Sequence, residues 1–188
     1  MPILGIWASQ NYPRVVDTGD MFPISTITVG TAGAASITFS SIPATYTHLQ
    51  IRSISRGTFA GSNTPVRFTV NSDTGSNYST HWLTGNGSSA SAGNETSVAY
   101  LYSFRQPANT ATASAFGTGI TDILDYTSTN KYKTVRSLSG YDTNGAGEIH
   151  LYSGLWLNTN AITSITMFPN VDNFAQYSSF ALYGIKGA

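Results

Sequence analysis

Short runs of alternating apolar and polar residues, separated by clusters of turn-forming residues, follow one another from residue 24 to the C-terminus. In residues 48–52, Leu49 and Ile51 alternate with polar neighbours, and residues 66–70 repeat the pattern. Because successive side chains of a β-strand point to opposite faces, this period of two is typical of strands with one buried face. Such runs predict an all-β domain, built as a sandwich or a barrel.

About ten strands are expected, and polar loops at 85–94 and 108–113 separate several of them. Residues 127–130 and 142–145 have the spacing of hairpin connections. Strands of this number with long loops favour a two-sheet antiparallel sandwich of jelly-roll type, and a closed barrel is the alternative. The expected strands are residues 24–29, 36–39, 48–52, 66–70, 78–83, 98–104, 116–126, 131–141, 148–157, 162–168 and 177–186.

The first 23 residues differ from the rest of the chain, since they contain three prolines and no sustained alternation. They are therefore expected to form an extended N-terminal docking arm (residues 1–23), followed by the β-sandwich domain (residues 24–188). An apolar group near the start is either a first strand of this domain or a segment that adds to a sheet of a neighbouring subunit. The prolines favour docking, and the residues concerned are Ile3, Leu4, Ile6 and Trp7.

The composition narrows the function classes. Hydrophobic residues make up 40% of the chain and charged residues only 10%, which excludes disorder driven by charge. Nine basic and nine acidic residues give a net charge of zero, so neither nucleic acid nor an anionic membrane is an expected partner. Near-neutral proteins are prone to self-association, which favours a homo-oligomer. No run of about 20 apolar residues is present, so no membrane insertion is expected.

The candidate catalytic and metal-binding motifs lack either the residue spacing or the side-chain orientation that the chemistry requires. Asp-Thr-Gly occurs at 17–19 and 73–75, as in the paired loops of aspartic proteases, but Asp-x-Gly is also common in turns. The segment from residue 71 begins like a calcium loop, yet its twelfth residue is Trp82. Asp122 and Asp125 are expected to be strand-end and turn carboxylates. We predict no catalytic residue, no metal and no cofactor.

Aromatic residues are the candidate binding residues. Exposed tyrosine and tryptophan side chains near loop tips stack on sugars or anchor protein interfaces. Core packing is the alternative for each of them. The candidate surface aromatics are Tyr78, Trp82, Tyr141 and Trp156.

A string of motifs spread over nearly the whole chain resembles a family of small virion proteins of tailed bacteriophages, described as tail-fibre or structural proteins. The resemblance implies no catalytic residues. The segments that carry it are Pro2–Gln10, Ser36–Pro43, Tyr46–Arg52, Asn130–Arg136, Ser153–Trp156, Ile162–Thr166 and Ser179–Gly187.

The expected function is therefore that of a non-enzymatic virion protein, made in the host cytoplasm and exposed on the particle surface. A homotrimeric tail-fibre or receptor-binding component is favoured, docked to other virion proteins through the N-terminal arm and touching a host surface glycan. A capsid decoration (cement) protein is the alternative within the virion, and a stand-alone carbohydrate-binding module is a further alternative.

Overall fold

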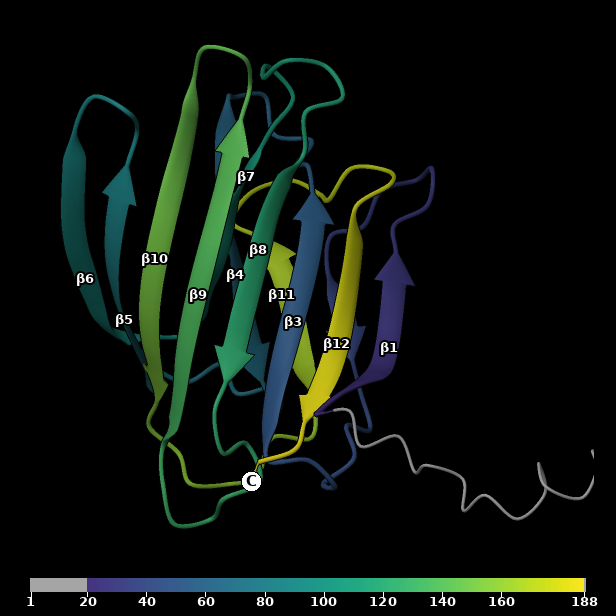
Figure 1. The fold of residues 1–188 in the computed structure, drawn as a ribbon, viewed down its shortest axis with the longest axis vertical. Coiled ribbons are helices and arrows are strands. Elements are labelled where there is room, and N and C mark those ends of the chain that lie inside the picture. Colours follow the sequence, from purple (N-terminus) through teal and green to yellow (C-terminus); the bar gives the residue numbers. More distant parts are fainter. Residues whose placement is uncertain (1–19, 188) are drawn as a thin grey trace, which may run out of the picture.

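Two antiparallel β-sheets pack face to face in the computed structural model, which describes residues 20–187 (Figure 1). No helix occurs in this range, and the predicted all-β sandwich is confirmed. In spatial order, the large sheet contains β1 (Met21–Thr28), β12 (Ser179–Ile185), β3 (His48–Ser55), β8 (Gly117–Ile123), β9 (Lys133–Asp142), β10 (Gly147–Trp156), β5 (Tyr78–Gly85) and β6 (Ala90–Val98). The small sheet contains β2 (Ile37–Phe39), β11 (Ile165–Pro169), β4 (Asn63–Val70) and β7 (Leu101–Pro107).

The strand order is that of a jelly roll with two inserted hairpins. When β5–β6 and β9–β10 are set aside, the other eight strands, renumbered in chain order, lie as 1-8-3-6 in one sheet and 2-7-4-5 in the other. This is the double Greek key of a jelly roll. The inserted hairpins widen the large sheet beyond β8, and β7, at the edge of the small sheet, packs against β8, β9 and β10. The far hairpin, β5–β6, extends beyond this edge (Figure 1).

The alternating runs place their apolar side chains between the two sheets, as predicted. Leu49 and Ile51 of β3 are buried, and their polar neighbours face outward. The apolar residues of β4 (Val66, Phe68 and Val70) face them from the small sheet and are equally buried. The hairpin connections expected at 127–130 and 142–145 also join antiparallel neighbours, β8 to β9 and β9 to β10.

The boundary between arm and domain lies earlier than predicted. Strand β1 begins at Met21, so residues 21–23, which were assigned to the arm, pair with β12. Pro23 is tolerated because β1 is an edge strand, and the register shifts between Pro23 and Ser25. The Phe22 ring stacks on Tyr46 with 5.7 Å between ring centroids.

The loop predicted at 85–94 is instead most of a β-hairpin. Only residues 86–89 lie outside β5 and β6, and the Asn86 side-chain oxygen accepts hydrogen bonds from the backbone of that turn. Strand β6 is rich in small residues because it is an exposed edge strand. Gly93 is required there, since a Cβ at this position would lie 2.4 Å from the Trp82 ring.

Candidate functional site

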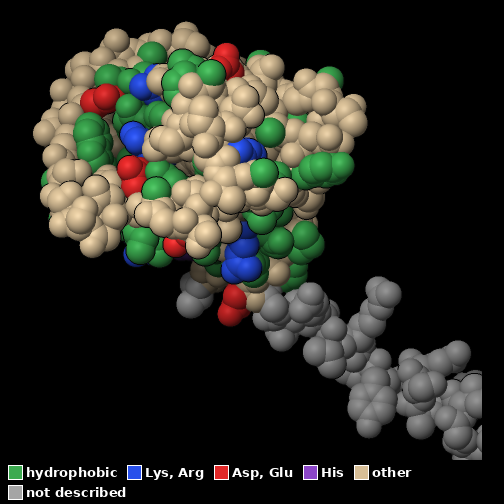
Figure 2. Space-filling model, turned by 90° about the horizontal axis from the view of Figure 1, so that it is seen from above, with side chains coloured by type: hydrophobic (Ala, Val, Ile, Leu, Met, Phe, Trp, Pro, Cys, Tyr) green, Lys and Arg blue, Asp and Glu red, His purple; other side chains and the backbone are tan. Residues whose placement is uncertain are grey.

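A hollow opens between the tips of the two inserted hairpins and the β7–β8 loop, at the upper end of the molecule in Figure 1. Figure 2, which looks onto this end, shows hydrophobic, basic and acidic side chains gathered in a hollow of the surface. We call it the tip groove, and its volume is about 460 Å³. Its side chains are chiefly polar, and they include Ser62, Asn63, Asn86, Thr110, Thr112, Tyr141, Thr143 and Glu148.

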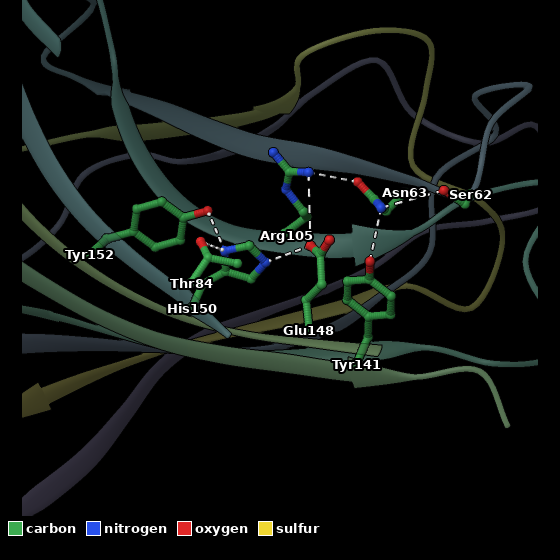
Figure 3. Close-up of polar contacts among 8 residues, drawn as sticks. All are labelled: Ser62, Asn63, Thr84, Arg105, Tyr141, Glu148, His150 and Tyr152. Carbon is green, nitrogen blue, oxygen red and sulfur yellow. Dashed lines mark hydrogen bonds and ion pairs between the residues drawn. The ribbon is translucent and has the colours of Figure 1, made fainter. Parts of the chain in front are cut away.

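A chain of hydrogen bonds fixes the floor of the tip groove (Figure 3). Asn63 donates from Nδ2 to the Tyr141 hydroxyl over 2.8 Å and accepts at Oδ1 from Arg105 over 2.9 Å. The same Arg105 nitrogen lies 3.8 Å from a carboxylate oxygen of Glu148. That oxygen lies 2.8 Å from Nε2 of His150. The network holds one aromatic ring, one amide and one carboxylate at the groove surface in fixed positions.

Aromatic side chains continue this surface into a smaller pocket of about 80 Å³ beside His150. Tyr102, from the edge of the small sheet, stacks on Tyr152 at 5.6 Å and meets Trp82 edge-on at 5.9 Å. Arg67 in turn lies 3.8 Å above the ring of the neighbouring Tyr100. The inner face of the inserted hairpins is therefore a polar and aromatic surface, whereas the core between the two sheets consists of aliphatic and aromatic residues.

Local structure explains how the groove residues come together. Tyr141 and Glu148 pair directly across β9 and β10, so both side chains lie on the same face of the sheet. The turn between them contains Asn144 and Gly145, both with positive φ (60° and 127°), which suits these residue types.

The β7–β8 loop forms the opposite wall and is held by Arg56. The guanidinium of this residue donates to the carbonyl oxygens of Ala111, Thr112 and Ala115 over 2.8–2.9 Å. The Thr112 hydroxyl donates to the carbonyl of Thr143, which ties the loop to the β9–β10 tip. The segment predicted as a loop at 108–113 is confirmed as one, and it is an ordered wall.

Burial sets the protonation of the groove residues. It raises the pKa of Tyr141 to about 12, with the negative charge of Glu148 acting in the same direction. Burial also lowers the pKa of His150, by more than the hydrogen bond that His150 donates to Glu148 raises it. At neutral pH the groove therefore presents a protonated phenol, the buried imidazole of His150 beside it is neutral, and the charges of Arg105 and Glu148 offset each other.

The lowered pKa of His150 predicts a loss of stability in mild acid. Below about pH 6.5 the unfolded chain binds a proton at this histidine more readily than the folded protein does. The free energy of unfolding should therefore be highest above pH 6.5 and should fall as the pH drops toward the lowered pKa. Urea unfolding at about pH 7.5 and 5 measures this, and the His150→Gln variant should lose less stability between the two. Equal losses of unfolding free energy in the intact protein and the variant would contradict the lowered pKa of His150.

The contacts of His150 resemble the relay of a hydrolase triad, since Nδ1 lies 2.8 Å from the Thr84 hydroxyl and Nε2 lies near Glu148. Three features favour a scaffold role. Nδ1 also lies 3.3 Å from the Tyr152 hydroxyl, and the imidazole is almost fully buried. Thr84 sits within β5, which is paired on both sides, so its strand offers no free backbone N–H groups for an oxyanion.

The structure separates the four predicted surface aromatics into two pairs. Trp82 and Tyr141 are half-buried and line the small pocket and the tip groove. The prediction was wrong for Tyr78 and Trp156, which are 0% and 1% exposed and stack on each other in the core. Asn63, Arg105, Glu148 and His150 were not predicted as site residues. Only Glu148 carried a local signal, its place opposite Tyr141 across a predicted hairpin.

The carboxylates considered for catalysis have structural partners. Asp73 lies in a turn, as predicted, and accepts hydrogen bonds from Gly75, Asn77 and the buried Trp156 indole. Burial alone would raise the pKa of Asp73, but these hydrogen bonds lower it overall. Asp122 faces outward on β8 and binds Arg136, and Asp125 lies in the following turn and binds Lys131. The Asp-Thr-Gly segment at 17–19 lies outside the described residues.

Residues 20–187 contain no group of three histidine, cysteine, aspartate or glutamate side chains placed to hold a metal ion. The same range has no helix with the length and apolarity needed to cross a membrane. The predicted docking residues Ile3, Leu4, Ile6 and Trp7 lie outside the part of the chain that the structure describes. Comparison with protein-family models, curated proteins and solved structures gives no match.

Proposed function

We propose that this protein is a non-enzymatic virion protein on the surface of a tailed bacteriophage, most specifically a tail-fibre or receptor-binding component. In this proposal the tip groove binds a host surface glycan, and the N-terminal arm docks onto other virion proteins. The protein acts as a homo-oligomer and is made in the host cytoplasm.

The observation that carries the glycan part is the lining of the tip groove. Sugars present hydroxyl groups around a weakly apolar ring face, so their sites combine a few fixed polar groups with an aromatic ring. Tyr141, Asn63 and Glu148 supply these groups from rigid strands, and their hydrogen bonds fix them before a ligand arrives. The jelly-roll topology supports the proposal because viral capsid proteins and lectins use it. The sequence motifs support the phage setting.

Replacing Tyr141 by alanine should weaken glycan binding. The change removes the ring at the groove surface and the partner of Asn63, and we expect at least a tenfold loss of affinity, about 1.4 kcal/mol. Binding of the purified protein to a glycan array, followed by titration calorimetry with the best ligand, measures it. Tyr132→Ala is the control, since Tyr132 is 52% exposed but lies outside the groove. Equal losses in both variants, or no glycan bound by the intact protein, would refute the groove assignment.

The position on the particle needs a separate experiment. Immuno-gold labelling of intact phage with an antibody against this protein should mark the tail. Label confined to the head would replace the tail assignment with the alternative of a capsid decoration protein. A stable monomer that binds glycans but is absent from virions would support a stand-alone carbohydrate-binding module.

A further inference from the structure

The outer face of the large sheet, which points away from the small sheet, carries exposed aliphatic side chains on neighbouring strands. Aliphatic residues exposed singly are ordinary, but a contiguous group on one face marks an interaction surface. We call this group the outer apolar face, and it consists of Ile54, Leu83, Ile120, Leu138, Ile149 and Leu151, which are 41–65% exposed.

The strand register arranges these side chains in two rows across the sheet. In the first row Leu83, Leu151, Leu138 and Ile120 are directly paired from β5 through β10 and β9 to β8. In the second row Ile149 pairs with Gly140, and the row ends at Ile54 on β3. Neither row contains a charged residue between β5 and β8. The inserted hairpins thus create an apolar surface on one side of the sheet and the groove on the other.

The face contains both a projection and a hollow. Ile149 is its most exposed member, at 65%. Beside it, the absence of a side chain at Gly140 leaves a shallow hollow of about 280 Å³ that Ile120 and Leu138 also line. An interface between two identical copies has a two-fold axis, and every contact then occurs twice, with the partners exchanged. Ile149 of each copy can enter the apolar hollow at Gly140 of the other, so the same contact occurs twice, as a two-fold axis requires.

The exposed area of the outer apolar face is also large enough for a dimer interface. The six residues are 41–65% exposed, and six large aliphatic side chains exposed by about half present roughly 500 Å² together, near the upper end for the largest patch on a monomer. A standard interface buries about 800 Å² on each partner, of which roughly 57% is apolar. The outer apolar face therefore supplies about the apolar share that one partner of a stable dimer needs. The net charge of zero leaves no overall repulsion between two copies.

We propose that the outer apolar face is the interface with a second copy of this chain, related by a two-fold axis that runs along the strands between β9 and β10. This axis places Ile149 of each copy over Gly140 of the other. Leu151 then faces Leu138, and Leu83 faces Ile120. In the adjoining polar row, His81 of one copy lies opposite Asp122 of the other. Two large sheets stacked in this way have nearly aligned strands, as in other sheet-on-sheet packings.

The arrangement leaves both tip grooves open, because they lie on the opposite face of the sheet. A dimer would present two grooves, and linked sites bind a multivalent surface more tightly than one site does. This consequence rests on the proposed glycan function, whereas the interface itself does not depend on it.

Sedimentation velocity tests the interface. The intact protein should shift from a 20.0 kDa monomer toward a dimer between about 1 and 100 µM. Ile149→Glu should raise the dimer dissociation constant by about 30-fold or more, the effect typical of a central interface residue. Val171→Glu is the matched control, since Val171 is also exposed but lies in the loop after β11. A monomer at all concentrations, or a dimer that Ile149→Glu leaves intact, would overturn the proposal.

Cysteine cross-linking tests the position of the axis, because the chain has no cysteine of its own. Positions 81 and 122 of one chain lie on β5 and β8, with two strands between them, so about 14 Å separates them within the chain. Stacked sheets lie about 10 Å apart, so a thiol-specific cross-linker of that span should join the His81→Cys/Asp122→Cys protein into a covalent dimer, and it should not join either single variant. A covalent dimer in a single variant, or none in the double variant, would refute this axis.

Discussion

Replacing Lys133 by methionine should lower the free energy of unfolding by about 3–5 kcal/mol. The Lys133 side chain is fully buried, and its ammonium group donates to three backbone carbonyl oxygens, those of Ser128, Lys131 and Thr159, over 2.6–2.9 Å. Burial lowers the pKa of this lysine, and the nearby Asp125 raises it by less. Methionine has a similar volume but no donor, so the three buried carbonyls would be left without this partner.

The neighbouring Lys131 provides the control. Its ammonium lies 2.5 Å from Asp125, but its side chain is 66% exposed, and exposed ion pairs add little to stability. Urea unfolding at neutral pH should therefore show a much smaller loss for Lys131→Met than for Lys133→Met. If the two variants lose the same stability, the hydrogen bonds of Lys133 do not hold the β8–β9 connection and the loop after β10 together.

The sequence predicted the parts of the fold that depend on local pattern. Leu49 and Ile51 of β3 alternate with polar residues, and this period alone indicates which face is buried. The hairpins that join β8, β9 and β10 were predictable because turn-forming residues separate two alternating runs.

Strand β6 could not be predicted in the same way. Its sequence, ASAGNETSV, has only one large apolar residue, Val98, because an edge strand is bordered by one neighbouring strand and by solvent. Its pairing with β5 depends on backbone hydrogen bonds and on the Trp82 ring, which covers Gly93. A strand stabilised by its partner leaves no periodic signal of its own, so this segment was predicted to be a loop.

The candidate site was only partly predictable, because one part of the inner face of β10 packs in the core and another part borders the candidate site. His150, Tyr152 and Trp156 all point to this face, and the alternation does not distinguish them. Where the small sheet covers this face, Trp156 is part of the core. Where the inserted hairpins extend beyond the edge of the small sheet, His150 lines the small pocket beside the tip groove. Tyr141 is bonded to Asn63 on β4, and Asn63 is bonded in turn to Arg105 on β7. These residues are distant in sequence, and only the tertiary fold brings them together.

Replacing Trp156 by alanine should destabilise the protein by about 3–5 kcal/mol, the usual loss when a large buried ring is removed. Trp156 is 1% exposed, stacks on Tyr78 at 6.4 Å and donates its indole N–H to Asp73 over 2.7 Å. The substitution leaves a cavity in the core and removes one of the hydrogen bonds that hold the 71–75 turn. Urea unfolding followed by tyrosine fluorescence and circular dichroism measures the loss.

Trp82→Ala is the matched comparison, since both tryptophans lie on the same inner face of adjacent strands. Trp82 is only half-buried over Gly93, so its removal should destabilise less but should weaken glycan binding, because it lines the pocket beside the groove. The milder Trp156→Phe variant keeps a ring in the core and should bind glycan as the intact protein does. Weakened glycan binding in folded Trp156→Phe, with full binding by Trp82→Ala, would show that the ligand contacts the other end of this face.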